Sequence, residues 1–275
     1  MSDHRPIGVL DSGLGGLTVV KEVIRQLPNE NIIFIGDEAR MPYGVKTREQ
    51  IISYTREMVQ YLISQDVKLI IYGCNTATAN ALAQLRTEFT VPMIGVIKPG
   101  AQAAVKVSKT GSIGIIGTES TINSKSYSQT IAAIDSKVNV LGIAAQKFVS
   151  IVEADKINSQ EAEDNISETL LPFKDSDYDT LILGCTHFPM LKTQINKYLP
   201  KITLIDPAVS TVEITKGYLT DNKLLTDQDN RTIKLYTTGS ISEFSKLAKR
   251  WLQTDIAEIS LVNIGGSNER NNHSN

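Results

Sequence analysis

The chain has 275 residues, of which 41% are hydrophobic and 21% charged, enough for one large domain or two ordinary ones. Its formal net charge is −2, from 28 basic and 30 acidic side chains, which argues against a nucleic-acid-binding protein. No apolar run approaches the ~18 residues of a membrane-spanning helix, and the N-terminus lacks the apolar core of a signal peptide. We therefore expect a cytoplasmic protein with no membrane partner.

Short apolar runs rich in β-branched residues alternate with longer amphipathic segments. The runs lie at 7–10, 32–35, 69–72, 93–97, 113–116, 140–144, 180–183 and 202–205. Their apolar residues are consecutive, which is typical of strands buried on both faces of a parallel sheet. Segment 47–65 instead predicts a helix, because one stripe of it carries Ile51, Ile52, Met58, Val59 and Leu62. This alternation predicts an α/β fold with βαβ crossovers.

A weak internal repeat divides the chain. I-G-V-L-D-S-G (7–13) leads to G-C-N-T, and I-G-I-I-G-T-E (113–119) leads to G-C-T-H. We interpret the repeat as two pseudo-symmetric, doubly wound parallel-sheet domains that face a central cleft, with chance similarity between βαβ units as the alternative.

The expected domain boundaries follow from this repeat. Residues 1–97 and 208–264 would form a discontinuous first domain, completed by a strand at 233–238 and a helix at 240–252. Residues 98–207 would form the second, with linkers near Lys98-Pro99-Gly100 and Asp206-Pro207. The polar tail 265–275 is expected to be disordered.

Polar residues follow the ends of the predicted strands, where open α/β sheets bind their ligands. They are Asp11, Asp37, Cys74, Thr118, Cys185 and Asp206.

The only two cysteines, Cys74 and Cys185, occupy matched settings, each after an apolar run and a glycine. A disulfide is not expected in a reducing cytosol. At a strand-to-helix junction, a thiol pKa can fall below its reference value of about 8.5. The alternative is two small, buried, apolar cysteines.

His187, two residues after Cys185, is a candidate acid or base for that thiol, or else a structural residue. Asp11 could serve the other thiol, bind a substrate ammonium group, or cap the turn that follows it. The remaining histidines, His4 and His273, are expected in mobile termini.

Helix N-termini after the cysteines could each bind a carboxylate. Small polar side chains nearby would complete the hydrogen bonds: Ser12, Asn75, Thr76, Thr118, Thr121 and Thr186. A small dianionic or amino-acid substrate fits better than a polymer. The turn Pro42-Tyr43-Gly44 would form a wall or lid of the cleft, or an ordinary βα loop.

The stretch D-S-G-L-G-G-L-T (11–18) matches a dinucleotide fingerprint only in part. Gly13 and Gly15 fit G-x-G-x-x-G, but Thr18 occupies its third glycine position; Asp37 would be the ribose-binding acid. No P-loop and no H-E-x-x-H zinc motif occurs.

Two thiols across one small cleft suggest inversion of a stereocentre without a cofactor or metal. One thiolate would remove a proton from carbon, and the other thiol would supply a proton to the opposite face. Hydrogen bonds to the substrate carboxylate would stabilise the carbanion.

The motifs D-S-G-x-G-G, P-Y-G, G-C-N-T-A and G-C-T-H-F-P together resemble the glutamate racemase family of the cofactor-independent aspartate/glutamate racemase superfamily, from Ile7 to about Ile264. The resemblance implies that Cys74 and Cys185 are the acid–base pair, assisted by Asp11 and His187. It also implies a homodimer, a glutamate substrate, and D-glutamate destined for peptidoglycan. The implied substrate-binding residues are Asp11, Ser12, Pro42, Tyr43, Gly44, Asn75, Thr76, Thr118, Thr121, Thr186 and His187, with Glu153 near the site.

Three alternatives remain open. The first is a racemase for aspartate or another amino acid on the same scaffold. The others are a non-catalytic carboxylate-binding protein and a nucleotide-dependent oxidoreductase.

Overall fold

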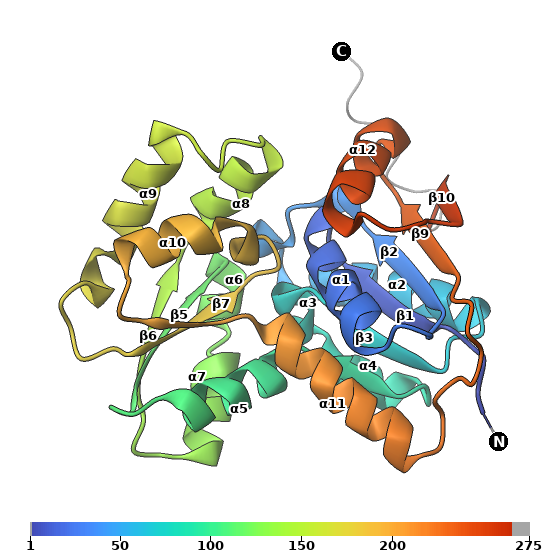
Figure 1. Cartoon of the computed structure of the whole chain (residues 1–275), viewed down its shortest axis with the longest axis horizontal. Coiled ribbons are helices and arrows are strands. Elements are labelled where there is room, and N and C mark those ends of the chain that lie inside the picture. Colours follow the sequence, from blue (N-terminus) through green and yellow to red (C-terminus); the bar gives the residue numbers. More distant parts are fainter. Residues whose placement is uncertain (1, 266–275) are drawn as a thin grey trace.

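Two parallel β-sheets organise the computed structural model, which describes residues 2–265 (Figure 1). The first sheet has the strand order β10-β9-β2-β1-β3-β4 and the second the order β6-β5-β7-β8. The strands of the first are β1 (Ile7–Asp11), β2 (Ile32–Gly36), β3 (Leu69–Tyr72), β4 (Met93–Gly95), β9 (Ile233–Thr237) and β10 (Glu258–Leu261). Those of the second are β5 (Ser112–Gly117), β6 (Asn139–Ala144), β7 (Thr180–Gly184) and β8 (Thr203–Ile205).

The predicted α/β fold is confirmed, with two differences. Strand β10 was not predicted, and β4 ends at Gly95, before the expected residue 97. The order β2-β1-β3-β4 recurs as β6-β5-β7-β8, strand for strand along the chain. This recurrence supports the repeat read from the sequence. The expected disordered tail lies outside the described residues, apart from Gly265.

Helices cover both faces of each sheet, which gives three layers. Each sheet with its covering helices is called a unit: the first unit contains the first sheet and the second unit the second sheet. On the first sheet, one face carries α1 (Leu17–Gln26), α11 (Pro207–Asp221) and α12 (Ile241–Leu252), and the other α2 (Arg48–Ser64), α3 (Asn75–Asn80) and α4 (Leu82–Glu88). On the second, one face carries α5 (Ile97–Val107) and α7 (Ser126–Ile134), and the other α8 (Gln146–Glu153), α9 (Gln160–Leu170) and α10 (Lys192–Tyr198). In the described part of the chain, no helix has both the length and the apolar character needed to cross a membrane.

The apolar stripe predicted in segment 47–65 is buried in α2. This helix begins after a capping box, in which the Thr47 side chain accepts from the Gln50 N–H and the Gln50 side chain accepts from the Thr47 N–H. The stripe is therefore confirmed, whereas the capping box was not predicted.

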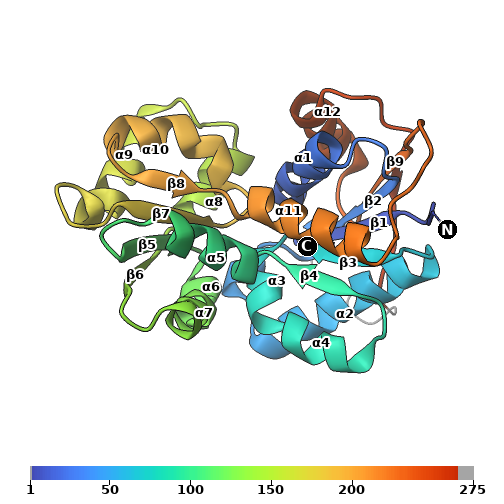
Figure 2. The ribbon, with the colours of Figure 1, turned by 60° about the horizontal axis from the view of Figure 1, so that its bottom comes forward.

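The chain crosses between the two sheets at α5 and at α11, which pack side by side (Figure 2). The expected linker Lys98-Pro99-Gly100 is not a loop but lies in α5. A Cβ atom on Gly100 would lie 3.0 Å from Cβ of Pro207, so glycine permits the close approach of the two crossings. Asp206 caps α11 by accepting from the Ala208 N–H at 2.9 Å. The domain boundaries near 97 and 207 remain a prediction.

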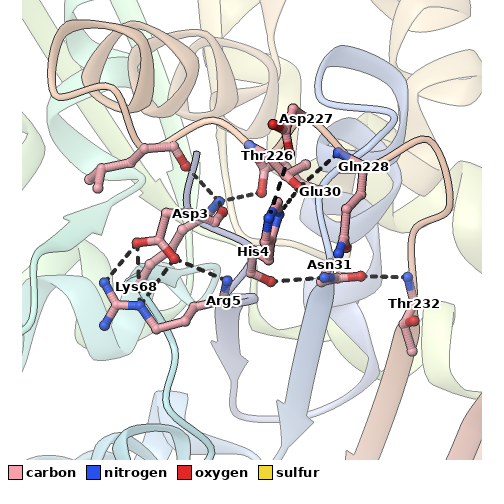
Figure 3. Close-up of polar contacts among 11 residues, drawn as sticks. Asp3, His4, Arg5, Glu30, Asn31, Lys68, Thr226, Asp227, Gln228 and Thr232 are labelled. Carbon is pink, nitrogen blue, oxygen red and sulfur yellow. Dashed lines mark hydrogen bonds and ion pairs between the residues drawn. The ribbon is translucent and has the colours of Figure 1, made fainter. Parts of the chain in front are cut away.

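The N-terminal residues are held against the first sheet by a polar cluster (Figure 3). The buried Lys68 ammonium lies 2.5 Å from the Glu30 carboxylate and donates to the carbonyl oxygens of Asp3 and Leu224, both at 2.8 Å. His4 Nδ1 lies 2.9 Å from Oγ1 of Thr226. The expectation of a mobile His4 is therefore wrong, and His273 lies outside the described residues.

Replacing Lys68 with methionine is expected to lower the free energy of unfolding by about 3–5 kcal/mol, because Glu30 would remain as a buried carboxylate without its cation. Urea denaturation measures this change. Lys197→Met is the matched control: Lys197 pairs with Glu163 at 2.9 Å, with 75% and 48% of the two side chains exposed. That exposed pair is expected to contribute less than about 1 kcal/mol. Equal losses of unfolding free energy in the two variants would contradict the assignment of Lys68 and Glu30 as a buried ion pair that stabilises the fold.

Candidate active site

A small cavity lies between the two units, beyond the carboxyl ends of the central strands. Its volume is about 20 Å³, room for one water molecule. It is lined by predicted residues from both units: Ser12, Pro42, Tyr43, Gly44, Cys74, Asn75, Thr76, Thr118, Cys185, Thr186, His187 and Glu153. Two other predicted residues, Asp11 and Thr121, lie directly behind this lining and hydrogen-bond to it.

Cys74 lies at a strand-to-helix junction, as the sequence predicts, and is itself the N-cap residue of α3. Its Sγ accepts from the Ala77 N–H at 3.4 Å and lies 3.5 Å from Oγ of Ser12. The expectation of a lowered thiol pKa is wrong here. Burial, with the nearby Asp11 carboxylate adding to it, raises the pKa of Cys74 to about 12.

Cys185 follows β7 but does not begin an α-helix, contrary to the prediction. A short 3₁₀ turn (Phe188–Leu191) comes next, and α10 starts only at Lys192. The partner of this thiol is therefore a side chain rather than a helix N-terminus: Nδ1 of His187 lies 3.7 Å from Sγ of Cys185.

His187 is buried between Cys185 and Glu153. Its Nε2 lies 3.2 Å from Oε1 of Glu153, whose side chain is 28% exposed. Burial alone would lower the imidazole pKa, but hydrogen bonding and charge from Cys185 and Glu153 raise it to about 10. The raised pKa favours the imidazolium form of His187, whose Nδ1 is placed to exchange a proton with the Cys185 sulfur.

Asp11 connects the two halves of the site from behind. It accepts from the Gly13 N–H at 3.0 Å and from the Thr186 hydroxyl at 3.2 Å. Asp11 therefore caps the turn that follows it, and it also lies near the Cys74 thiol. Burial raises the pKa of Asp11 from 3.8 to about 6.

Hydroxyl and amide groups from α3 meet those of the second unit. Oγ1 of Thr76 lies 2.9 Å from that of Thr118 and 3.2 Å from that of Thr121. The Tyr127 hydroxyl donates to Oδ1 of Asn75 at 2.7 Å. Both units therefore contribute polar groups to one surface.

Besides Asp11, two more of the polar residues at strand ends lie outside the cavity lining. Asp37 accepts hydrogen bonds from Tyr43, from Arg40 at 2.7 Å and from Thr238 at 2.8 Å, so it fixes the Pro42-Tyr43-Gly44 turn. These bonds leave it no ribose-binding role. Asp206 lines a separate cavity of about 490 Å³.

Sequence reasoning missed three residues of the lining, namely Met41, Gln146 and Val149. Gln146 carries the same signal as the others, because it follows the end of β6 closely. Met41 and Val149 are ordinary apolar residues, and no local pattern marks them.

Replacing Asp11 with asparagine is expected to stabilise the fold at pH 8 by about 1–3 kcal/mol and to have little effect at pH 4. The folded-state pKa of about 6 exceeds the reference value of 3.8. The protonated form therefore stabilises the fold below pH 4, and this stabilisation is lost as the pH rises through about 6. Urea denaturation of both proteins at the two pH values checks this. A pH-independent difference would contradict it.

Comparison with known proteins agrees with the fold. The family model of the Asp/Glu/hydantoin racemases matches residues 7–215, so the chain belongs to that family, and it is an amino-acid racemase. A glutamate racemase from Lactococcus lactis subsp. lactis is 44% identical over 273 residues, 97% of this chain and 99% of that protein.

Two solved structures extend the likeness to three dimensions. Glutamate racemase isoform RacE1 from Bacillus anthracis has a TM-score of 0.92 at 42% identity, covering 95% of this chain and 98% of that one. The glutamate racemase from Francisella tularensis subsp. tularensis, in complex with D-glutamate, has a TM-score of 0.89 at 37% identity with the same coverage.

Proposed function

We propose that this chain interconverts L-glutamate and D-glutamate by a two-base proton transfer between Cys74 and Cys185. The observation that carries the proposal is that both thiols line one cavity, with opposite charges nearby: the Asp11 carboxylate near Cys74 and the His187 imidazolium beside Cys185. The substrate is proposed from the relatives, which are glutamate racemases.

The raised pKa of Cys74 keeps it a thiol at neutral pH, so it is the proton donor in the resting enzyme. In one direction, the Cys185–His187 pair takes the α-proton, and the Cys74 thiol gives its proton to the opposite face of the carbanion. The other enantiomer reacts by the reverse transfers. The hydroxyl and amide groups of Ser12, Asn75, Thr76, Thr118, Thr121 and Thr186 would bind the carboxylates and stabilise charge on the α-carboxylate.

The cavity has to widen before substrate enters, because an amino acid is several times larger than the one water molecule that the cavity can hold. We propose that the two units separate about the packed helices α5 and α11. Reclosure would exclude water from the carbanion and bring both sulfurs to the substrate carbon.

The test is incubation with L-glutamate, and separately with D-glutamate, in D₂O. Circular dichroism follows racemisation, and NMR follows the α-hydrogen. Racemisation with deuterium in the inverted product would support the proposal. No exchange with either enantiomer, in folded and reduced protein, would reject glutamate. The same assay with aspartate separates the alternative substrate, and a thermal shift with NAD or NADP separates the oxidoreductase.

Three further proposals follow from the family. D-Glutamate made here would supply peptidoglycan synthesis, the protein would act in the cytoplasm, and it would form a homodimer. Sedimentation equilibrium tests the last of these.

A further inference from the structure

Tyr127 of α7 contacts both of the segments that carry the cysteines, and the residue is only 2% exposed. Its hydroxyl donates to Oδ1 of Asn75, the residue after Cys74, at 2.7 Å. Its ring packs against Gly184, the residue before Cys185: a Cβ atom on Gly184 would lie 3.2 Å from Cε2 of the ring. One side chain of the second unit therefore contacts both halves of the site.

The Tyr127 hydroxyl reaches Asn75 beside the two crossings between the units. A Cβ atom on Gly100 of α5 would lie 3.4 Å from this hydroxyl and 3.0 Å from Cβ of Pro207, the first residue of α11. Burial raises the pKa of Tyr127 well above its usual value of 10.0, so the hydroxyl keeps its proton at neutral pH. It is therefore a hydrogen-bond donor from the second unit to the first.

An amide side chain has two unlike ends, an oxygen that accepts hydrogen bonds and a nitrogen that donates them. Tyr127 binds the oxygen end of Asn75, which leaves Nδ2 for another partner. Nδ2 donates to no acceptor among residues 2–265, yet it is not one of the buried unpaired atoms in that range, so it borders open space. Asn75 lines the cavity, and the cavity is therefore the space that Nδ2 faces.

We infer that Tyr127 is a positioning residue: its hydrogen bond to Oδ1 of Asn75 holds the amide so that Nδ2 faces the cavity and donates to a carboxylate of the substrate. The inference rests on the proposed function, in which Asn75 binds a substrate carboxylate. Tyr127 acts through Asn75, because Tyr127 itself does not line the cavity.

Replacing Tyr127 with phenylalanine keeps the ring and removes only the hydroxyl. The Asn75 amide is then free to turn its oxygen toward water in the cavity. A bound carboxylate would force that oxygen back against the ring, where it is buried without a donor, and an unpaired buried acceptor is unfavourable. The loss therefore falls on binding: KM for glutamate should rise by about 10-fold, while kcat should change much less.

The circular dichroism assay gives KM and kcat. Glutarate, a dicarboxylate that has no stereocentre and cannot be racemised, is used as a competitive inhibitor to measure binding alone. Its inhibition constant should rise by the same factor as KM, because the lost contact is to a carboxylate. Tyr72→Phe is the matched control: Tyr72 is also buried, and its hydroxyl donates to Sδ of Met93 at 3.3 Å. This control should match wild type.

A double-mutant cycle separates positioning through Asn75 from a general structural role. Asn75→Ala removes the group that Tyr127 is inferred to hold, so Tyr127→Phe should weaken glutarate by less than about 2-fold further in that background. A full further loss in the Asn75→Ala background would overturn the inference, and so would an unchanged KM in Tyr127→Phe alone.

Asn75→Asp tests the orientation of the amide, and it is the test variant if Tyr127→Phe does not fold. Aspartate keeps an oxygen for the Tyr127 hydroxyl but replaces Nδ2 with a second oxygen, which would repel a substrate carboxylate. Glutarate binding should weaken by about 100-fold. Unchanged or tighter binding would overturn the inference, because an acceptor would then suit the position assigned to Nδ2. Failure of wild type itself to racemise glutamate would reject the proposed function instead.

Discussion

Cys74→Ser and Cys185→Ser are each expected to reduce racemisation of glutamate by at least about 10³-fold. Two-base inversion needs a proton acceptor on one face of the substrate carbon and a proton donor on the other. A serine hydroxyl has nearly the shape of a thiol but is a far weaker acid, so it neither ionises near neutral pH nor donates its proton readily. The circular dichroism assay measures the loss in both directions.

Exchange of the α-hydrogen in D₂O gives a sharper readout of the same variants. Each variant keeps one sulfur, so each should exchange the hydrogen of only the enantiomer that faces that sulfur. The two variants should therefore select opposite enantiomers. Exchange should be faster in Cys74→Ser, which keeps the Cys185–His187 pair, because burial and the Asp11 charge raise the pKa of the remaining Cys74 in the other variant. A wild-type rate of racemisation in either variant would contradict the proposal that the two thiols act on opposite faces of the substrate carbon. The same enantiomer preference in both variants would contradict it as well.

Strands could be predicted wherever burial on both faces left a continuous apolar run, as in β1 and β7, whose residues are all buried. Strand β10 reads E-I-S-L and is only half-buried at the sheet edge, so its sequence carries no such run. The segment Lys98-Pro99-Gly100 suggested a linker because proline and glycine usually interrupt helices. The segment is helical because it forms the first turn of α5, where proline is tolerated. Gly100 has no side chain and so leaves room for Pro207.

The lining of the site could be predicted because most of its residues follow strand ends, and parallel strands bring those ends together. The pKa shifts of the residues in the site could not be predicted from the sequence. The Cys74 pKa depends on burial and on Asp11, and these two residues are neighbours only because β1 and β3 pair in the sheet. Likewise, the His187 pKa is raised by Cys185, two residues before it, and by Glu153, which comes from a different helix and lies against Nε2.

Gly15→Ala is expected to lower kcat/KM by roughly 10²-fold or more while the fold is retained. A Cβ atom on Gly15 would lie 2.2 Å from Oγ1 of Thr186 and 2.7 Å from Nδ1 of His187. Real Cβ atoms do not approach so closely, so both side chains have to shift. Gly15 lies in a short 3₁₀ turn and its φ is not positive, so the backbone itself accepts alanine.

The expected loss follows from what these two side chains hold. Thr186 donates to Asp11, and His187 lies 3.7 Å from the Cys185 sulfur, so a shift of about 1 Å misplaces the base and can cost 10²-fold in rate. Gly217→Ala is the matched control: Gly217 is exposed in α11, a Cβ atom there meets nothing within 4 Å, and alanine should stabilise the helix by up to about 1 kcal/mol without changing activity. Thermal unfolding separates lost stability from lost catalysis. Wild-type kcat/KM in Gly15→Ala would mean that the tight contact between Gly15 and the Cys185 side of the site does not position the reacting groups.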